Sequence, residues 1–151
     1  MISFKWTNGY DEAFKDFYLK TEEYYSSLVG GIDNRRSFVK YNISDAITDV
    51  IIAYDDEKPI ACAGLKRYSK SDAEIKRVWV EPEYRGRHLA GDMMKLIEEK
   101  ALTLGFKRTV LQTRKIMEDA VHLYEKLGYK KIDNYPPYDK LDGAICFAKD
   151  L

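Results

Sequence analysis

The segment from Tyr84 to Gly91 reads Tyr-Arg-Gly-Arg-His-Leu-Ala-Gly and lies between an expected strand and an expected helix. The first backbone N–H groups of a helix have no partners within it and carry the positive end of its dipole, so small residues there can bind a pyrophosphate. Arg85 and Arg87 would add positive charge. The segment is not a Walker loop, because Gly-Lys-Ser/Thr is missing, nor a dinucleotide fingerprint, because Gly-x-Gly-x-x-Gly is missing. A basic turn of this kind is usually only a turn, so it needs support from the rest of the chain.

Cysteine and histidine offer little further chemistry. Cys62 and Cys146 are the only two cysteines; each lies in an apolar, strand-like segment, and there is no Cys-x-x-Cys spacing. We therefore expect buried free thiols and no bound metal. His122 lies two residues before Tyr124 on an expected helix and points away from it, so we interpret His122 as a surface residue.

The composition predicts one globular domain over residues 1–151, with 45% hydrophobic and 33% charged residues. No run approaches the roughly 20 apolar residues of a membrane span. The first residues resemble neither a secretory signal nor a transit peptide, which predicts a cytoplasmic location. A net charge of zero argues against nucleic acid as a partner. Residues 61–131 nevertheless carry 16 basic and 10 acidic side chains, so a polyphosphate ligand would favour this segment.

The first half of the chain predicts strands after one long or broken helix. Ile2–Trp6 can form a strand, and apolar residues recur at roughly helical spacing from Asp11 to Leu28. Gly30-Gly31 would end this helix, and residues 33–42 can form a second, short one. The apolar runs Val50–Tyr54 and Ile60–Leu65 then predict a hairpin whose turn spans residues 55–59.

The second half alternates strands and helices. Ala73–Val80 predicts a strand that ends at Glu81-Pro82, and a helical period follows from Leu89 to Leu104, with Gly105 placed to cap it. Thr109–Thr113 predicts a strand, and Asp119–Leu127 predicts a helix that ends at Gly128. The last pair of strands is expected at 129–132 and 144–149. These elements predict a mixed α/β sheet, antiparallel in its first half, with a βαβ crossover in its second.

Two motifs, in this order and spacing, resemble the GNAT (GCN5-related) N-acetyltransferase superfamily. The run EIKRVWVEPEYRGRHLAGDMMKLIEEKA resembles its central motif, a strand ending in Val-x-Pro followed by Arg/Gln-x-x-Gly-x-Gly/Ala. The run DAVHLYEKLGYKK resembles a later helix end, Ala-x-x-Leu-Tyr-Glu-Lys-Leu-Gly-Phe/Tyr. The resemblance implies one GNAT-like α/β domain, a mixed central sheet of six to seven strands with flanking helices. His88 departs from the usual glycine at its loop position, and Met117 departs from a common asparagine.

The resemblance also implies the functional residues. Tyr124 would be the general acid near the thioester sulfur, and Glu74 would draw the amine proton, through water. The alternatives are a packing role for Tyr124 and a salt bridge between Glu74 and Lys76 or Arg77. The acceptor cleft would lie among the first helices and the last loop, where Tyr24, Tyr25, Tyr135 and Tyr138 occur. The implied cofactor-binding positions are Val78, Trp79, Val80, Arg85, Gly86, Arg87, His88, Leu89, Ala90, Gly91, Gln112, Thr113, Tyr124 and Lys126.

The function implied by the resemblance is acetyl-CoA-dependent acetylation of a primary amine, with acetyl-CoA as the donor and a small molecule as the acceptor. Neither a metal nor a membrane is expected to take part, and a homodimer is allowed. Two alternatives stay open at this point. The acceptor can be a peptide or protein amine, or the domain can bind CoA without turning it over.

Overall fold

A computed structural model of the chain describes residues 1–28 and 46–151. The short helix expected at residues 33–42 lies outside them. The described elements, in chain order, are β1 (Ile2–Thr7), α1 (Glu12–Leu28), β2 (Asp49–Asp55), β3 (Lys58–Arg67), β4 (Asp72–Val80), the 3-10 helix η3 (Pro82–Tyr84), α3 (Leu89–Thr103), β5 (Arg108–Arg114), α4 (Glu118–Lys126), β6 (Lys130–Ile132), the 3-10 helix η4 (Tyr138–Lys140) and β7 (Ala144–Asp150).

The strands form one seven-stranded sheet in the order β1-β2-β3-β4-β5-β7-β6. β4 and β5 are parallel, and each of the other neighbouring pairs is antiparallel. α3 lies in the connection between the parallel strands, as a parallel pair requires. The expected mixed α/β sheet with a single crossover is thereby confirmed.

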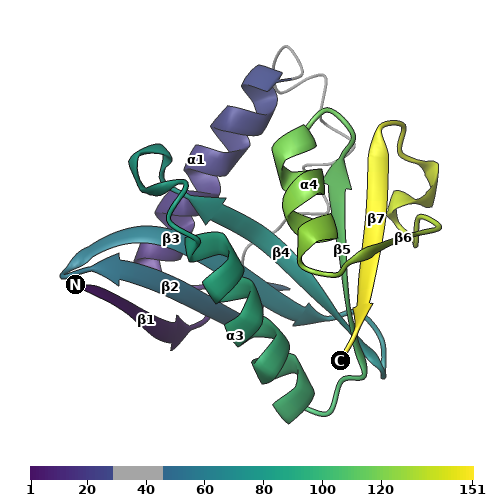
Figure 1. Cartoon of the computed structure of the whole chain (residues 1–151), viewed down its shortest axis with the longest axis horizontal. Coiled ribbons are helices and arrows are strands. Elements are labelled where there is room, and N and C mark those ends of the chain that lie inside the picture. The colour runs from purple at the N-terminus through teal and green to yellow at the C-terminus, as the bar shows by residue number, and fades with distance from the viewer. Residues whose placement is uncertain (29–45) are drawn as a thin grey trace.

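Helices cover both faces of the sheet (Figure 1). α3 and α4 lie on one face, where Met93, Ile97 and Tyr124 pack with Ile51 and Leu111 of the strands. α1 lies on the other face, where Phe14 and Phe17 pack with Ile52 and Trp79. Neighbouring residues such as Ile51 and Ile52 therefore serve opposite cores, because successive side chains of a strand point to opposite faces. None of the described helices is long and apolar enough to cross a membrane.

Glycines end the two helices on the α3 side as the sequence predicts. Gly105, two residues after the end of α3, has a φ of 95°, and Gly128, two residues after the end of α4, has a φ of 94°. Both values lie in the left-handed region, which glycine adopts without steric cost.

The β2–β3 hairpin is tighter than expected. Asp55 pairs with Lys58, so the turn consists of Asp56 and Glu57, and Pro59 belongs to β3. Asp56 takes a left-handed φ of 53°, which suits a two-residue turn. Pro59 is tolerated in the strand because it pairs with Tyr54, next to a register irregularity.

Candidate functional site

The site lies where two parallel strands separate. Pairing between β4 and β5 runs from Asp72 with Arg108 to Ile75 with Leu111 and then ends, although β4 continues to Val80. Figure 1 shows the two strands diverging beyond this point, with α4 beside the gap. We call this opening the wedge. A cavity of about 90 Å³ lies in it, lined by parts of β4, β5, α4, α1 and η4.

A β-bulge in β4 determines which side chains enter the wedge. Lys76 pairs with Gly64 and Trp79 with Cys62, so Arg77 and Val78 lie opposite the single residue between these two on β3. Arg77 has a φ of 59°, a left-handed conformation that is unusual for a residue with a side chain. In consequence Arg77 extends toward α1, whereas Val78 packs with the core of the α3 face.

Glu74 and Lys76 form a buried polar cluster with two tyrosines from the loop before β7. Tyr135 donates a hydrogen bond to Glu74 Oε2 at 2.8 Å, and the Tyr138 hydroxyl also hydrogen-bonds this carboxylate. Lys76 Nζ donates to the Tyr138 hydroxyl at 2.7 Å. Burial lowers the pKa of Lys76 to about 8, and burial raises the pKa of both tyrosines, which keeps their hydroxyls protonated. Glu74 is only 3% exposed.

Arg77 connects the bulge to α1. Its Nη1 donates to Thr21 Oγ1 at 2.9 Å, and its Nη2 pairs with the carboxylate of Glu22. The guanidinium also lies 4.2 Å from the ring centroid of Tyr18. These contacts attach the first helix to the strand that lines the wedge.

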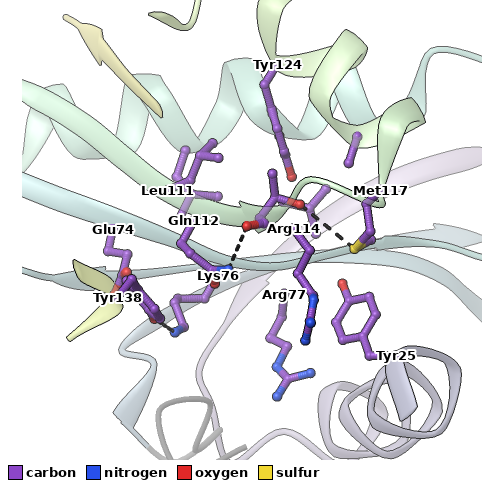
Figure 2. Close-up of a pocket in the computed structure, with 14 residues that line it drawn as sticks. Tyr25, Glu74, Lys76, Arg77, Leu111, Gln112, Arg114, Met117, Tyr124 and Tyr138 are labelled. Carbon is purple, nitrogen blue, oxygen red and sulfur yellow. Dashed lines mark hydrogen bonds between the residues drawn. The ribbon is translucent and has the colours of Figure 1, made fainter. Parts of the chain in front are cut away.

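Tyr124 enters the cavity from the opposite side (Figure 2). It projects from α4, while Lys76, Arg77, Tyr25 and Tyr138 lie on the other side of the wedge. Its ring packs against Tyr129 and Phe147, with centroids 6.0 and 6.3 Å apart. Burial raises its pKa, so the hydroxyl carries its proton at neutral pH.

On the α4 side of the cavity, a contact between Thr113 and Met117 joins β5 to the start of α4. Thr113 Oγ1 lies 3.9 Å from the sulfur of Met117, and both residues line the cavity. Met117 is the residue immediately before α4 and makes no side-chain cap to it. Gln112 also lines the cavity and donates to the backbone carbonyl of Thr113 at 2.7 Å.

The loop that carries Arg85 and Arg87 leads into the start of α3, which has no side-chain cap. His88 precedes α3 in a left-handed conformation, with a φ of 63°, and makes no side-chain cap. Gly86 has a φ of 82°. Among the loop arginines, Arg87 lies 4.9 Å from the ring centroid of Tyr84, whereas Arg85 donates from Nε to the carbonyl of Val80 at 2.9 Å. The first N–H groups of α3 thus have no side-chain cap and adjoin exposed arginines.

The structure brings together part of the residue set expected from the sequence. Five of the implied catalytic and cofactor-binding residues line the cavity: Glu74, Val78, Gln112, Thr113 and Tyr124. Tyr25 and Tyr138, expected at the acceptor cleft, line it as well. The segment from Arg85 to Gly91 lies outside it, at the start of α3. The Trp79 side chain packs on the α1 face instead, where its ring meets Tyr24, because the bulge sets it opposite to Val78 and Val80. Lys126 and His122 are exposed on α4, the latter as expected.

Sequence reasoning missed the basic side of the cavity. From the sequence, Lys76 and Arg77 are candidates only for a salt bridge with Glu74, and no motif assigns a role to Arg114. The sequence does contain one signal for this basic side, namely two adjacent cationic residues inside the otherwise apolar run from Ile75 to Val80. Cys62 and Cys146 are buried and free, as expected.

Comparison with known proteins identifies the family of this chain. The sequence model of the acetyltransferase (GNAT) family matches residues 6–129. The chain is 38% identical over 66 residues to the uncharacterized N-acetyltransferase YjgM of Escherichia coli, covering 43% of this chain and 40% of that protein. It is 26% identical over 137 residues to a mycothiol acetyltransferase of Corynebacterium efficiens, covering 90% of this chain and 43% of that protein. The chain therefore spans less than half the length of these curated relatives.

A solved structure shows the same fold. A GNAT family acetyltransferase from Elizabethkingia anophelis, with acetyl-CoA bound, superimposes with a TM-score of 0.70 at 18% identity and covers 99% of this chain and 98% of that one. At this identity the likeness concerns the fold alone. Because the family's sequence model extends over most of the chain and through both motifs, the chain belongs to the acetyltransferase (GNAT) family.

Proposed function

We propose that residues 1–151 act as one acetyltransferase domain that transfers the acetyl group of acetyl-CoA to a primary amine of a small molecule. The observation that carries this proposal is the wedge. Its cavity is reached by the Tyr124 hydroxyl from the α4 side and lined by Glu74 at the far side. A group that donates a proton and a group that accepts one therefore line a single cavity, as acetyl transfer to an amine needs.

The chain offers a binding surface of the right kind for acetyl-CoA. The uncapped start of α3 and the Arg87 side chain suit a pyrophosphate, since both favour negative charge. β4 has no β5 partner beyond Ile75, so its backbone from Val78 to Val80 can pair with an extended pantetheine arm. When bound, acetyl-CoA supplies an acetyl group already activated as a thioester.

The reaction needs two proton transfers, and Glu74 and Tyr124 each carry out one of them. The amine nitrogen forms a bond to the acetyl carbon, and the carbon–sulfur bond breaks. Glu74 accepts the proton that the amine loses, directly or through water, and Tyr124 donates a proton to the departing sulfur. Because burial raises the pKa of Tyr124, the hydroxyl is protonated and ready to donate.

A small acceptor fits the cavity better than a protein. The volume is about 90 Å³, and Tyr25 of α1 and Tyr138 of η4 line the side opposite Tyr124. The relative matched along 90% of this chain is named a mycothiol acetyltransferase, a name that describes action on a small molecule.

A homodimer stays a prediction. Light scattering would measure the molar mass in solution and so test it.

The proposal is tested by measuring thiol release from acetyl-CoA in the presence of a pool of primary amines, with CoA binding measured in parallel by calorimetry. We expect amine-dependent thiol release and an acetylated amine in the mass spectrum. CoA binding without release on any amine would instead identify a non-catalytic binding module. Release only with peptides would move the acceptor to the peptide class.

A further inference from the structure

Glu74 is a buried carboxylate that two tyrosines of one loop hydrogen-bond. The loop before β7, residues 133–143, brings the hydroxyls of Tyr135 and Tyr138 to it, and Tyr135 donates to Oε2 at 2.8 Å. A carboxylate removed from water stays ionised only where donors or positive charges replace the water. An ionised carboxylate is the form that can accept a proton, so the role proposed for Glu74 depends on these donors.

The two hydroxyls differ in their other contacts. Tyr138 lines the cavity and also accepts a hydrogen bond from Lys76 Nζ at 2.7 Å. Tyr135 does not line the cavity, and burial raises its pKa, so its hydroxyl keeps the proton that it donates to Glu74. Tyr135 therefore acts on the reaction through Glu74 and not by touching a substrate.

Tyr135 packs against two other tyrosine rings. Within the loop, its ring lies edge-on to that of Tyr138, with centroids 5.5 Å apart. Asn134 donates to the backbone carbonyl of Ala144 at 3.1 Å, which joins the start of the loop to the start of β7. The ring of Tyr68, from another part of the sheet, also lies edge-on to Tyr135, with centroids 4.7 Å apart.

Tyr68 connects the loop to the turn between β3 and β4. It is the first residue after β3, and its hydroxyl donates to the backbone carbonyl of Pro136 at 2.7 Å. Glu74 belongs to β4 of the same hairpin and pairs with Lys66 of β3. A single hairpin therefore carries both the carboxylate and the ring that contacts its donor, Tyr135.

We propose that Tyr135 is a positioning residue that orients the Glu74 carboxylate for proton transfer, and that Tyr68 fixes Tyr135 for this role. This inference rests on the proton transfer proposed for Glu74. Hydrogen bonds made before the amine binds fix the orientation of the carboxylate in advance, which lowers the cost of reaching the reactive geometry.

Tyr135→Phe tests the first part of the inference, because it keeps the ring and removes the hydroxyl. We expect kcat/KM for the amine to fall about ten-fold at neutral pH, the scale of a hydrogen bond to a charged group, with KM for acetyl-CoA little changed. The pH below which activity is lost should rise, because a carboxylate with one donor fewer takes up a proton more readily. In a Glu74→Gln background the same change should have no further effect, since the group through which Tyr135 acts is absent.

The pH profile reports this change because the other charged and titratable groups around Glu74 stay the same. Among the described residues these are Tyr68, Lys76, Tyr138 and Cys146, with Arg77 and Arg114 lining the same cavity. Tyr129→Phe is the matched control. It also removes a hydroxyl that donates to a carboxylate, that of Glu98 at 2.9 Å, but away from the cavity, and it should keep the parent profile.

Two variants of Tyr68 test the second part. Tyr68→Ala removes both contacts with the loop, whereas Tyr68→Phe removes only the hydrogen bond to Pro136. We expect Tyr68→Ala to reduce kcat/KM about as much as Tyr135→Phe does, and Tyr68→Phe to reduce it less. Combining Tyr68→Ala with Tyr135→Phe should add little, because both changes act on one hydrogen bond. Tyr10→Ala removes another exposed tyrosine, just before α1, and should leave kcat/KM unchanged.

Carbon-13 NMR of the side-chain carboxyl groups gives a test that needs no turnover. Glu74→Gln identifies the Glu74 resonance. At constant pH, Tyr135→Phe and Tyr68→Ala should shift that resonance, because its hydrogen bonding changes. Tyr129→Phe should shift the resonance of Glu98 and leave that of Glu74 in place.

The outcomes separate this inference from the proposed function. In an active enzyme, a parent pH profile in Tyr135→Phe, or an equal fall in the parent and Glu74→Gln backgrounds, would overturn the inference and leave acetyl transfer standing. Parent kinetics in Tyr68→Ala would overturn the role of Tyr68. Absence of turnover on every amine would contradict the proposed function. The carboxyl resonances would then decide whether Tyr135 holds Glu74, and an unchanged Glu74 resonance would overturn it.

Discussion

Tyr124 has a hydroxyl whose role can be separated from the packing of its ring. The ring is buried against Tyr129 and Phe147, and the residue lines the cavity. Tyr124→Phe retains the ring and removes the proton donor. We expect kcat to fall by roughly 10²-fold, the usual scale for a general acid, with KM for acetyl-CoA little changed. Steady-state kinetics with varied acetyl-CoA measures both.

Tyr129→Phe is the matched control for this change. Its hydroxyl is buried with Thr109 and Glu98, at 2.8 and 2.9 Å, and does not line the cavity. Its removal should cost about 1 kcal/mol of unfolding free energy and leave kcat near the parent value. If Tyr124→Phe keeps the parent kcat, Tyr124 is a packing residue, the alternative that the sequence left open.

Glu74 is the group proposed to accept the proton that the amine loses. Glu74→Gln retains an oxygen that can accept from Tyr135 but removes the proton acceptor for the amine. We expect activity to be low at neutral pH and to recover as pH rises toward the pKa of the acceptor amine, because the amine then arrives neutral. A pH profile of kcat/KM for the parent and the variant measures this. A constant activity ratio across pH would mean that the base lies elsewhere or is water.

The sequence predicts these two positions but not their surroundings. Glu74 and Tyr124 follow from motifs whose spacing is local. The approach of Lys76 and Arg77 on one side of the wedge depends on the bulge, which changes the register of β4 against β3 by one residue. A bulge leaves no reliable mark in the sequence, since alternation alone would separate these two side chains.

At the scale of elements, the start of α3 is the surface proposed for the pyrophosphate. Arg87 is exposed there and Arg85 is bonded back to Val80, so Arg87 is the arginine available to a ligand. Arg87→Glu should weaken CoA binding by about ten-fold or more and make it less sensitive to salt. Calorimetric titrations at low and high salt measure both effects. Lys131→Glu makes the same charge change on exposed β6 and serves as control. Equal effects of the two variants would mean that the loop before α3 does not bind the pyrophosphate.

The backbone conformation of His88 shows why the family's motif has a glycine at this position. Its φ of 63° is left-handed, the region in which glycine is favoured. The resemblance thus places a glycine where the backbone needs one, and the chain accepts histidine at a cost. His88→Gly should raise the free energy of unfolding by up to about 1 kcal/mol. Arg87→Gly, at a residue without positive φ, should lower it. Chemical denaturation compares the two, and a loss of stability in His88→Gly would show that its side chain contributes contacts that outweigh the strain.

The helices follow from local sequence features, whereas the β2–β3 turn does not. α3 and α4 have apolar residues at helical spacing and a glycine after the last turn, and both features are local. The sequence predicts a β2–β3 turn over residues 55–59, three residues longer than the turn of the structure, because the acidic run and Pro59 are typical of a turn. Asp55 instead ends β2, and Lys58 and Pro59 begin β3. Their inclusion in β3 depends on pairing with β2, which the local sequence does not contain.

At the scale of the whole molecule, the wedge is a property of the sheet's order. The order of strands and helices along the chain predicts a mixed sheet with one crossover. It does not predict that β7 inserts between β5 and β6, nor that β4 and β5 pair only as far as Ile75 and Leu111. Both features depend on contacts between residues far apart in sequence, and the early end of the β4–β5 pairing leaves the gap in which the cavity lies.

The central claim is that the wedge and the start of α3 hold acetyl-CoA, and amide NMR shifts during a titration of isotope-labelled protein with CoA test it most directly. We expect the largest shift changes at the backbone amides of Val78 and Val80 in β4 and of Leu89 to Gly91 in α3, and we expect them to saturate together. Saturable CoA binding that leaves these amides unchanged, with the largest changes on another part of the sheet, would contradict it.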